Sequence, residues 1–382
     1  MPEVSSKPIA NRYSVVIAAL TIIALLGFLF VGRLVGRFQE QQKAVARHLY
    51  AQGLSEQQAG KPELALAHFR AALTYSRDNF QYQLSLARAL RDSGRTDEAQ
   101  TYLVSLWERA PQDGAVNLAL GRLAARQNSL DKLIQYYHNA IYGVWASNEQ
   151  QNRLNAWFEL VEVLLRWNAR PQAQAELIAL SASLPMNLDL LLRAADLCMR
   201  SQDYQHAFAE YRRVLQMDHA NAHAAVGAAE AAFNLGRYRS AEHYLEAANK
   251  ENPDDTQIAR MLEVSKLVLQ QDPFTRGLTT DERTSRIRVV FAQAGKRLDS
   301  CMNAAPQNST PPGQSDSLSS LRDQWQQMDH QLRRLGREGE SGLADSVMDL
   351  VLKIEQQTTN CTISPQDEAL LLLAQNRGGV EQ

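Results

Sequence analysis

The feature that most constrains this chain is one position that recurs at a fixed interval. It is alanine in five cases and leucine in one, with a single longer interval after the third: Ala65, Ala99, Leu133, Ala173, Ala207 and Ala241. The period is about 34 residues, which is typical of stacked helix-turn-helix units. Such stacks form extended binding surfaces, so the sequence predicts an all-α repeat protein that binds partners and is not an enzyme.

Other positions keep the same period. A large apolar residue follows four positions later, and Pro111, Pro185 and Pro253 fall where proline would end the second helix of a unit. Five positions before the recurring alanine or leucine comes a residue that tolerates a left-handed turn, and Gln202 is the exception. The other five turn residues are Gly60, Gly94, Asn128, Asn168 and Gly236.

The whole pattern resembles the tetratricopeptide-repeat family. The unit at 222–255 carries it best, with Gly236-Arg237-Tyr238, Ala241, Leu245, Ala248 and Pro253. The resemblance implies six helix pairs and binding of proteins or peptides, with no cofactor and no small-molecule substrate. The six units are placed at 46–79, 80–113, 114–147, 154–187, 188–221 and 222–255.

Six extra residues at 148–153 separate the third unit from the fourth, and Trp145 stands where proline would end the preceding helix. Either that helix is longer or a loop intervenes. Three repeats are about the minimum for a stable stack, so we expect two halves, 46–147 and 154–255, either of which could fold.

An uncharged segment precedes the repeats. Residues 13–32 contain no charged side chain and are bounded by Arg12 and Arg33. Twenty residues at about 1.5 Å each span a hydrocarbon core of about 30 Å, so we expect a short tail (1–12), a transmembrane helix (13–33) and a juxtamembrane helix (34–45). A cleaved signal peptide is the alternative, but its apolar region is about 7–15 residues long and ends in a small-residue site.

Orientation is open. Basic residues are more numerous after the span than before it, which by itself favours a cytoplasmic body. A short tail with its own Lys7 and Arg12 commonly stays inside, and on that ground we expect a single-pass membrane protein whose soluble part is periplasmic. Cys301 and Cys361 could form a disulfide, which would fit an oxidising compartment. Cys198 falls at an apolar repeat position and is expected to be a core thiol.

The tail differs from the repeats. After a capping helix at 256–274, a helical module is expected at 275–382, interrupted by a Pro- and Ser-rich linker at 303–317. Its apolar stripes, such as Leu321, Trp325 and Met328, favour either a small bundle or a dimerisation seam. Ser364 to Asp367 look like the start of a last helix.

In the family that the chain resembles, the first helix of each unit lines the concave face. Mapping that face gives a candidate partner-binding groove: Tyr50, Leu54, Leu84, Arg88, Arg91, Arg122, Arg126, Phe158, Glu162, Arg166, Met199 and Phe233. Its early part is basic, so an acidic segment or a terminal carboxylate would be drawn to the arginines, whose forked heads match carboxylates. The alternative is that these arginines are solvated or pair with acids of neighbouring helices. Leu54 replaces the Asn that chaperone-tail binders use, so a chaperone tail is not expected.

Composition limits the remaining classes. Lys and Arg number 40 against 42 Asp and Glu, a net charge of −2, which argues against nucleic acid as the main ligand. No phosphate loop, zinc-type cysteine pair or nucleophile elbow is present in the sequence, and His219 and His223 lack a third metal ligand. We expect a membrane-anchored scaffold for proteins or peptides, in a setting such as assembly of an envelope complex. The alternatives are a structural subunit or homodimer with permanent contacts and, third, an enzyme with an unrecognised site.

Overall fold

The computed structural model describes residues 10–304, 314–334, 341–358, 361 and 364–375. Within these residues the chain is helical, and its only extended pairing is an isolated bridge between Asp113 and Val144. The expected all-α fold class is therefore confirmed. The helices divide into two compact units, residues 1–160 and 161–382, which are described separately.

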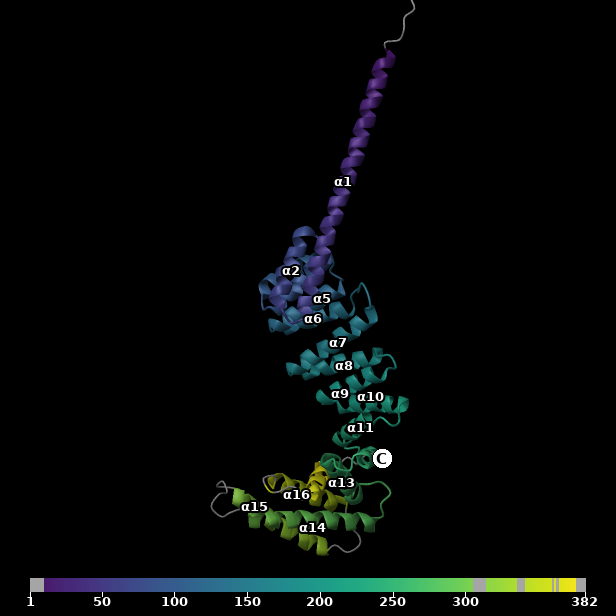
Figure 1. The fold of residues 1–382 in the computed structure, drawn as a ribbon. Coiled ribbons are helices and arrows are strands. Elements are labelled where there is room, and N and C mark those ends of the chain that lie inside the picture. Colours follow the sequence, from purple (N-terminus) through teal and green to yellow (C-terminus); the bar gives the residue numbers. More distant parts are fainter. Residues whose placement is uncertain (1–9, 305–313, 335–340, 359–360, 362–363, 376–382) are drawn as a thin grey trace, which may run out of the picture. The chain divides into compact units, whose positions relative to one another are not determined.

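The first unit begins with one long helix. α1 (Ala10–Gln58) continues without a break from the uncharged segment into the first repeat (Figure 1). The helices that follow are α2 (Pro62–Tyr75), α3 (Phe80–Asp92), α4 (Thr96–Arg109), α5 (Gly114–Arg126), α6 (Leu130–Ile141) and α7 (Glu149–Arg166), the last of which crosses into the second unit. α1 packs on α2, α3 on α4 and α5 on α6, which is the pairing that the repeat period predicts.

Helix ends follow the turn chemistry of the repeat. Asn79 and Asp113 cap α3 and α5, since their side chains accept the backbone N–H of Tyr82 at 3.1 Å and of Val116 at 2.9 Å. All six turn positions have positive φ, between 55° and 78°. Gln202, the exception in the sequence, is no exception in conformation, with φ of 64°.

Close helix packing depends on glycine at two positions of this unit. A Cβ at Gly121 would lie 2.7 Å from the ring of Tyr137, and one at Gly53 would lie 2.6 Å from the ring of Phe69. Both rings are fully buried. The large residue of the second helix thus fills the space that the small residue of the first helix leaves open.

The six extra residues at 148–153 do not lengthen the preceding helix, and only part of them belongs to a loop. α6 ends at Ile141, so of the two alternatives the longer second helix is wrong and the intervening loop is correct. A loop follows, and most of the extra residues extend the start of α7, which has 18 residues where α5 has 13. Trp145 does not end a helix. Its indole N–H donates to the carbonyl of Ala140 at 3.0 Å, and its ring covers Gly114, whose N–H donates to the carbonyl of Val144 at 2.8 Å.

The second unit continues the repeats and adds the tail. Its helices are α8 (Arg170–Ser183), α9 (Leu188–Arg200), α10 (Tyr204–Met217), α11 (Ala222–Asn234), α12 (Tyr238–Glu251), α13 (Thr256–Gln271), α14 (Thr280–Ala304), α15 (Gln314–Arg334), α16 (Ser341–Gln357) and α17 (Pro365–Gln375). α13 lies where the capping helix is expected. Residues 303–304 and 314–317 at the ends of the expected linker are helical, and its centre lies outside the described residues.

The tail helices α14–α17 pack on one another and on α13. Phe291 of α14 stacks on Trp325 of α15 with ring centroids 5.0 Å apart, and Val347, Val351 and Ile354 of α16 are fully buried. The apolar stripes that could have formed a dimer seam are therefore used within the module itself. Leu321 and Met328 join the same core.

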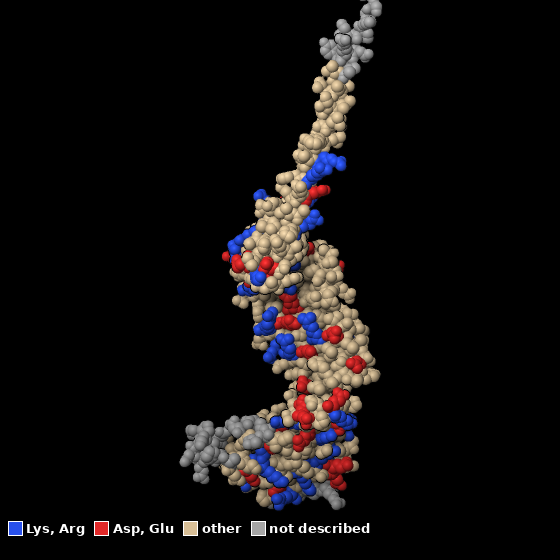
Figure 2. Space-filling view, in the orientation of Figure 1, with Lys and Arg blue, Asp and Glu red and all other residues tan. Residues whose placement is uncertain are grey.

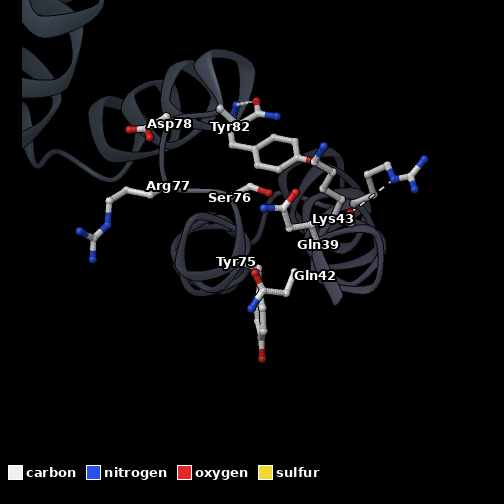
Figure 3. Close-up of a pocket in the computed structure, with 10 residues that line it drawn as sticks. Gln39, Gln42, Lys43, Tyr75, Ser76, Arg77, Asp78 and Tyr82 are labelled. Atoms are coloured by element: carbon white, nitrogen blue, oxygen red, sulfur yellow. Dashed lines mark hydrogen bonds between the residues drawn. The ribbon is translucent and has the colours of Figure 1, made fainter. Parts of the chain in front are cut away.

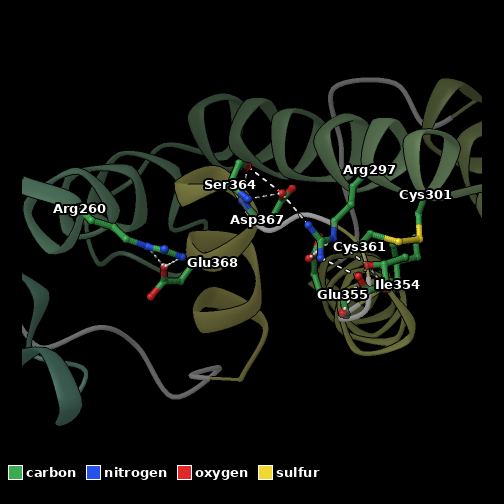
Figure 4. Close-up of polar contacts among 10 residues, drawn as sticks. Arg260, Arg297, Cys301, Ile354, Glu355, Cys361, Ser364, Asp367 and Glu368 are labelled. Carbon is green, nitrogen blue, oxygen red and sulfur yellow. Dashed lines mark hydrogen bonds and ion pairs between the residues drawn. A yellow bond between two sulfur atoms is a disulfide. The ribbon is translucent and has the colours of Figure 1, made fainter. Parts of the chain in front are cut away.

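A disulfide and a buried ion-pair network tie the module together (Figure 4). Cys301 of α14 is bonded to Cys361, with Cα atoms 5.8 Å apart. Arg297 of α14 pairs with Glu355 of α16 at 2.9 Å and with Asp367 of α17 at 2.6 Å. Burial raises the pKa of Glu355 to about 8; Arg297 opposes this shift, but Asp367 shares the same guanidinium and adds to it.

The start of α17 has the chemistry that its sequence predicts. The Ser364 hydroxyl accepts the N–H of Asp367 at 3.3 Å, and the Asp367 carboxylate accepts the N–H of Ser364 at 2.9 Å, a reciprocal cap. Cys198 is a buried thiol in α9, as its repeat position predicts, and burial raises its pKa to about 12.

Candidate partner-binding site

Four arginines from two consecutive repeats form the basic part of the site in the first unit. Arg88 of α3 and Arg122 of α5 occupy the same position of their repeats, and Arg91 and Arg126 follow on the next turn of each helix. Each first helix presents the same stripe, so the period of the sequence places these side chains in register. We call these four residues the arginine cluster.

Arg122 is fully paired. Its Nε and Nη2 atoms donate to the two carboxylate oxygens of Glu159 at 2.7 and 2.6 Å, a forked geometry. The hydroxyl of Tyr137 donates to the same carboxylate at 2.8 Å. Burial would raise the pKa of Glu159, but the hydrogen bonds and charge of Arg122 outweigh it and lower that pKa. Hydrogen bonds to Glu159 likewise raise the pKa of Arg122.

Arg91 and Arg126 share one acid. Arg91, 8% exposed, donates through Nε and Nη2 to Asp92 Oδ1 at 2.9 and 2.7 Å, and Arg126 approaches the same oxygen at 3.9 Å. The alternative raised by the sequence, pairing with acids of neighbouring helices, thus describes Arg122 and, at 3.9 Å, Arg126. Arg91 pairs with an acid of its own helix.

Two guanidinium nitrogens of the cluster lack an acceptor among the described residues. Nε of Arg88 and Nη1 of Arg91 are buried without a hydrogen-bond partner, and the Arg88 head makes only a 3.4 Å contact to the carbonyl of Ala115. Burial lowers the pKa of Arg88, and repulsion from Arg122 and Arg91 lowers it further. Buried donors without acceptors are costly, so this part of the site is short of negative charge.

The corresponding helices of the second unit are acidic and largely satisfied. Asp196 of α9 accepts the hydroxyl of Tyr211 at 2.6 Å and contacts Nε2 of His223 at 2.8 Å. Glu162 pairs with Arg193 at 2.7 Å. Burial, with Asp255 contributing, raises the pKa of Glu230 on α11.

Comparison with known families decides the identity of the fold. A family model described as tetratricopeptide repeat matches residues 56–123 and 198–263. This chain is a tetratricopeptide-repeat protein. The matched ranges cover parts of both units, on either side of the insertion.

Several solved structures are similar to this tetratricopeptide-repeat protein at low sequence identity. A structure from a functional study of Pseudomonas aeruginosa pilF is 17% identical, covers 57% of this chain and 97% of its own, and gives a TM-score of 0.38. PilW, described as a type IV pilus biogenesis factor, is 17% identical, covers 57% of this chain and 98% of its own, and gives a TM-score of 0.38. YrrB, described as having an unusual peptide-binding site, is 12% identical, covers 50% of this chain and 95% of its own, and gives a TM-score of 0.36. No curated protein matches the sequence.

Not all of the residues mapped onto the groove reach the surface. Leu84 is 1% exposed and Phe158 is fully buried, so both belong to the core and offer no partner contact, because their helices turn these side chains inward. Tyr50 is half-buried, stacked on Tyr82 at 4.4 Å, with its hydroxyl 3.0 Å from that of Ser85.

The remaining mapped residues are accessible to different degrees. Leu54 of the first repeat is exposed, and Arg166 lies at the end of α7. Met199 is half-buried on α9, and Phe233 is half-buried against the ring of Tyr238 at 5.5 Å.

The two residues that complete the Arg122 site, Tyr137 and Glu159, are not among those mapped onto the groove from the sequence. Tyr137 reads as a core residue, because the large position of the second helix is apolar in most repeats, and its hydroxyl is the only signal of a polar role. Glu159 lies at a position of α7 that the family mapping does not use. Both belong to the first unit.

The described residues hold no group of three or more His, Cys, Asp or Glu side chains arranged for a metal ion. His219 and His223 are not a pair: the ring of His219 contacts the carbonyl of Leu215, and that of His223 contacts Asp196.

Proposed function

We propose that this tetratricopeptide-repeat protein is a membrane-anchored scaffold that binds an acidic segment, or a terminal carboxylate, of a partner protein at the arginine cluster. Tetratricopeptide repeats are protein-interaction scaffolds, so the scaffold role in this proposal is supported by the family. The observation that carries the rest is the pair of buried guanidinium donors on Arg88 and Arg91 without an acceptor among the described residues. A carboxylate supplies an acceptor for these nitrogens and the negative charge that Arg88 lacks.

Membrane anchoring is supported by the exposed apolar surface of α1. The large apolar side chains between Val16 and Val31 are 56–80% exposed. α1 is the one described helix that is long and apolar enough to cross a membrane, and its most apolar stretch is not buried. An apolar surface of this length is stable inside a bilayer and not in water. A role in assembling an envelope complex and a periplasmic body are parts of the same proposal.

The binding site is tested by crosslinking in cells. A photoreactive amino acid at Leu54, an exposed residue mapped onto the same groove, captures the partner, which mass spectrometry then identifies. We expect Arg88→Gln with Arg91→Gln to reduce capture roughly tenfold or more, since hydrogen bonds to charged groups contribute about 1.5–3 kcal/mol each.

The matched control removes two arginines from the same unit but outside the cluster. Arg70 and Arg95 both pair with Glu98, at 3.1 and 2.6 Å. Arg70→Gln with Arg95→Gln should leave capture unchanged. Equal capture by both double variants and the parent, with unchanged circular dichroism, would mean that the arginine cluster does not bind the partner.

A further inference from the structure

A second candidate site in the first unit is a pocket lined by residues outside the arginine cluster. It has a volume of about 620 Å³ and is formed by α1, by the turn between α2 and α3, and by the start of α3. Figure 3 shows the side chains of Lys43, Gln39 and Tyr82 directed into it, whereas Arg77 and Asp78 point away. Gln42, Arg47, Tyr75, Ser76 and Asn79 complete the lining.

The residues that line the pocket are mostly hydrogen-bond donors. Lys43 and Arg47 are cations, Gln39 and Gln42 carry amide N–H groups, and Ser76 and Tyr82 carry hydroxyls. The only carboxylate of the lining, Asp78, is directed outward. Such a set suits an anion with several acceptor oxygens, of which phosphate is the common case.

The pocket lies next to the apolar part of α1. The exposed apolar surface of this helix continues beyond the uncharged segment through Leu34 and Val35 to Phe38, which is 60% exposed. Lys43 comes five residues after Phe38 and ten after Arg33, about 7.5 Å and about 15 Å along the helix axis. The headgroup layer on each side of a bilayer is about 5–8 Å thick. The pocket therefore lies at the outer edge of this layer if Phe38 marks the end of the apolar surface, and just outside it if Arg33 does.

The basic residues of α1 also favour a position beside an anionic membrane. At about 100° per residue, Arg33, Arg37, Lys43 and Arg47 fall on one face of the helix, together with a single acid, Glu40. Figure 2 shows this mainly positive stretch directly after the uncharged part of the helix. Basic residues within a Debye length of an anionic membrane are attracted to it.

We propose that this pocket binds the phosphate headgroup of an anionic membrane phospholipid, with Lys43 and Arg47 as the charge partners. The proposal rests on the membrane insertion of α1 proposed above. A membrane lipid is favoured over an acidic peptide because the pocket follows the exposed apolar surface of α1 on the same helix, next to the layer where lipid phosphates are concentrated. The lipid would hold the first repeat against the membrane.

The test measures how fast Lys43 is acetylated in the full chain, reconstituted in nanodiscs and read by peptide mass spectrometry. Discs of phosphatidylcholine are compared with discs containing one quarter phosphatidylglycerol. We expect Lys43 to react at least threefold more slowly in the anionic discs. Lys132, an exposed residue of α6, is the internal reference and should react equally in both.

Two uncharged variants separate the pocket from general surface attraction. Ser76→Leu and Gln39→Trp fill the pocket without changing the charge, and Gln39 is exposed, so its replacement leaves the fold intact. Both should abolish the protection of Lys43. Protection that persists in either variant would reflect attraction to the anionic surface alone and would overturn the proposal.

A third arm identifies the source of the phosphate. Glycerol phosphate added to phosphatidylcholine discs should not protect Lys43, and protection by it without phosphatidylglycerol would overturn the lipid assignment. Equal acetylation of Lys43 in both kinds of disc would also overturn the lipid assignment. Failure of the anchor is a separate outcome, because the chain would then not co-purify with discs of either composition.

Discussion

At the residue scale, equivalent repeat positions have different roles. Arg88 and Arg122 stand at the same position of consecutive repeats, yet Arg122 is held by Glu159 and Arg88 keeps a buried donor without an acceptor among the described residues. The difference comes from the acid that α7 supplies to Arg122 alone. In the proposed binding mode, a partner carboxylate would therefore pair with Arg88 and Arg91 without first breaking the pair at Arg122.

Glu355 of the C-terminal module makes stability depend on pH. Its pKa is about 8 in the folded protein and 4.5 for the unperturbed group, so the folded state binds more protons between these values. The free energy of unfolding should therefore be highest below about pH 4.5 and fall as the pH rises through about 8. Glu355→Gln stays neutral and should remove this fall, as measured by hydrogen exchange of α16 between mildly acidic and mildly alkaline pH.

Asp345 provides the control for this experiment, since it is an exposed carboxylate on the same helix. Asp345→Asn should keep the pH dependence of the parent. If Glu355→Gln also kept it, the pKa of Glu355 would not be raised by its burial.

At the element scale, each helix pair depends on a left-handed turn. Gly60, Gly94 and Gly236 adopt this conformation without cost, and Asn128 and Asn168 tolerate it. Gln202 adopts it between α9 and α10 although its Cβ makes the conformation unfavourable. The packing of the two helices on each other outweighs the local preference of one residue.

Replacing Gln202 should therefore stabilise the fifth repeat. The left-handed conformation costs a residue with a Cβ about 1–2 kcal/mol, and the added freedom of glycine in the unfolded chain offsets part of this. We expect Gln202→Gly to raise the free energy of unfolding by about 0.5–1 kcal/mol. Hydrogen exchange of α9 and α10 in the full chain measures the change.

The Gln202 side chain also accepts a hydrogen bond from Arg170 at 2.6 Å. Gln202→Ala loses that bond and keeps the unfavourable conformation, so it should not be more stable than the parent. Equal gains for alanine and glycine would show that the side chain, and not the backbone, causes the strain.

At the scale of the whole molecule, the anchor and the disulfide bear on the same question of orientation. A signal anchor would place the repeats and the C-terminal module on the extracytoplasmic side, where Cys301 and Cys361 can stay oxidised. We expect Lys132→Cys to react with a membrane-impermeant maleimide in bacterial spheroplasts without lysis.

The thiols give an independent reading of orientation. Protein unfolded without reductant should show one free thiol, Cys198, beside any engineered one. Labelling of Lys132→Cys only after lysis, together with three native free thiols, would place the soluble part in the cytoplasm.

The sequence by itself determined the repeat, because a fixed period sets which faces must meet in every unit and needs no partner to be read. It also indicated the uncharged segment, the candidate disulfide and the arginines of the second and third repeats, since each depends on composition or spacing. Leu84 and Phe158 were misplaced, because a family mapping gives a position on a helix and not the packing around it.

Only the tertiary structure decided which of those residues are free to act. That Arg122 is paired depends on Glu159 and Tyr137, which reach it from other helices. The pocket at Lys43 likewise exists because α1 passes the turn between α2 and α3, which is distant in the sequence. Contacts between distant segments are set by the packing of the whole unit, and no local pattern in the sequence encodes them.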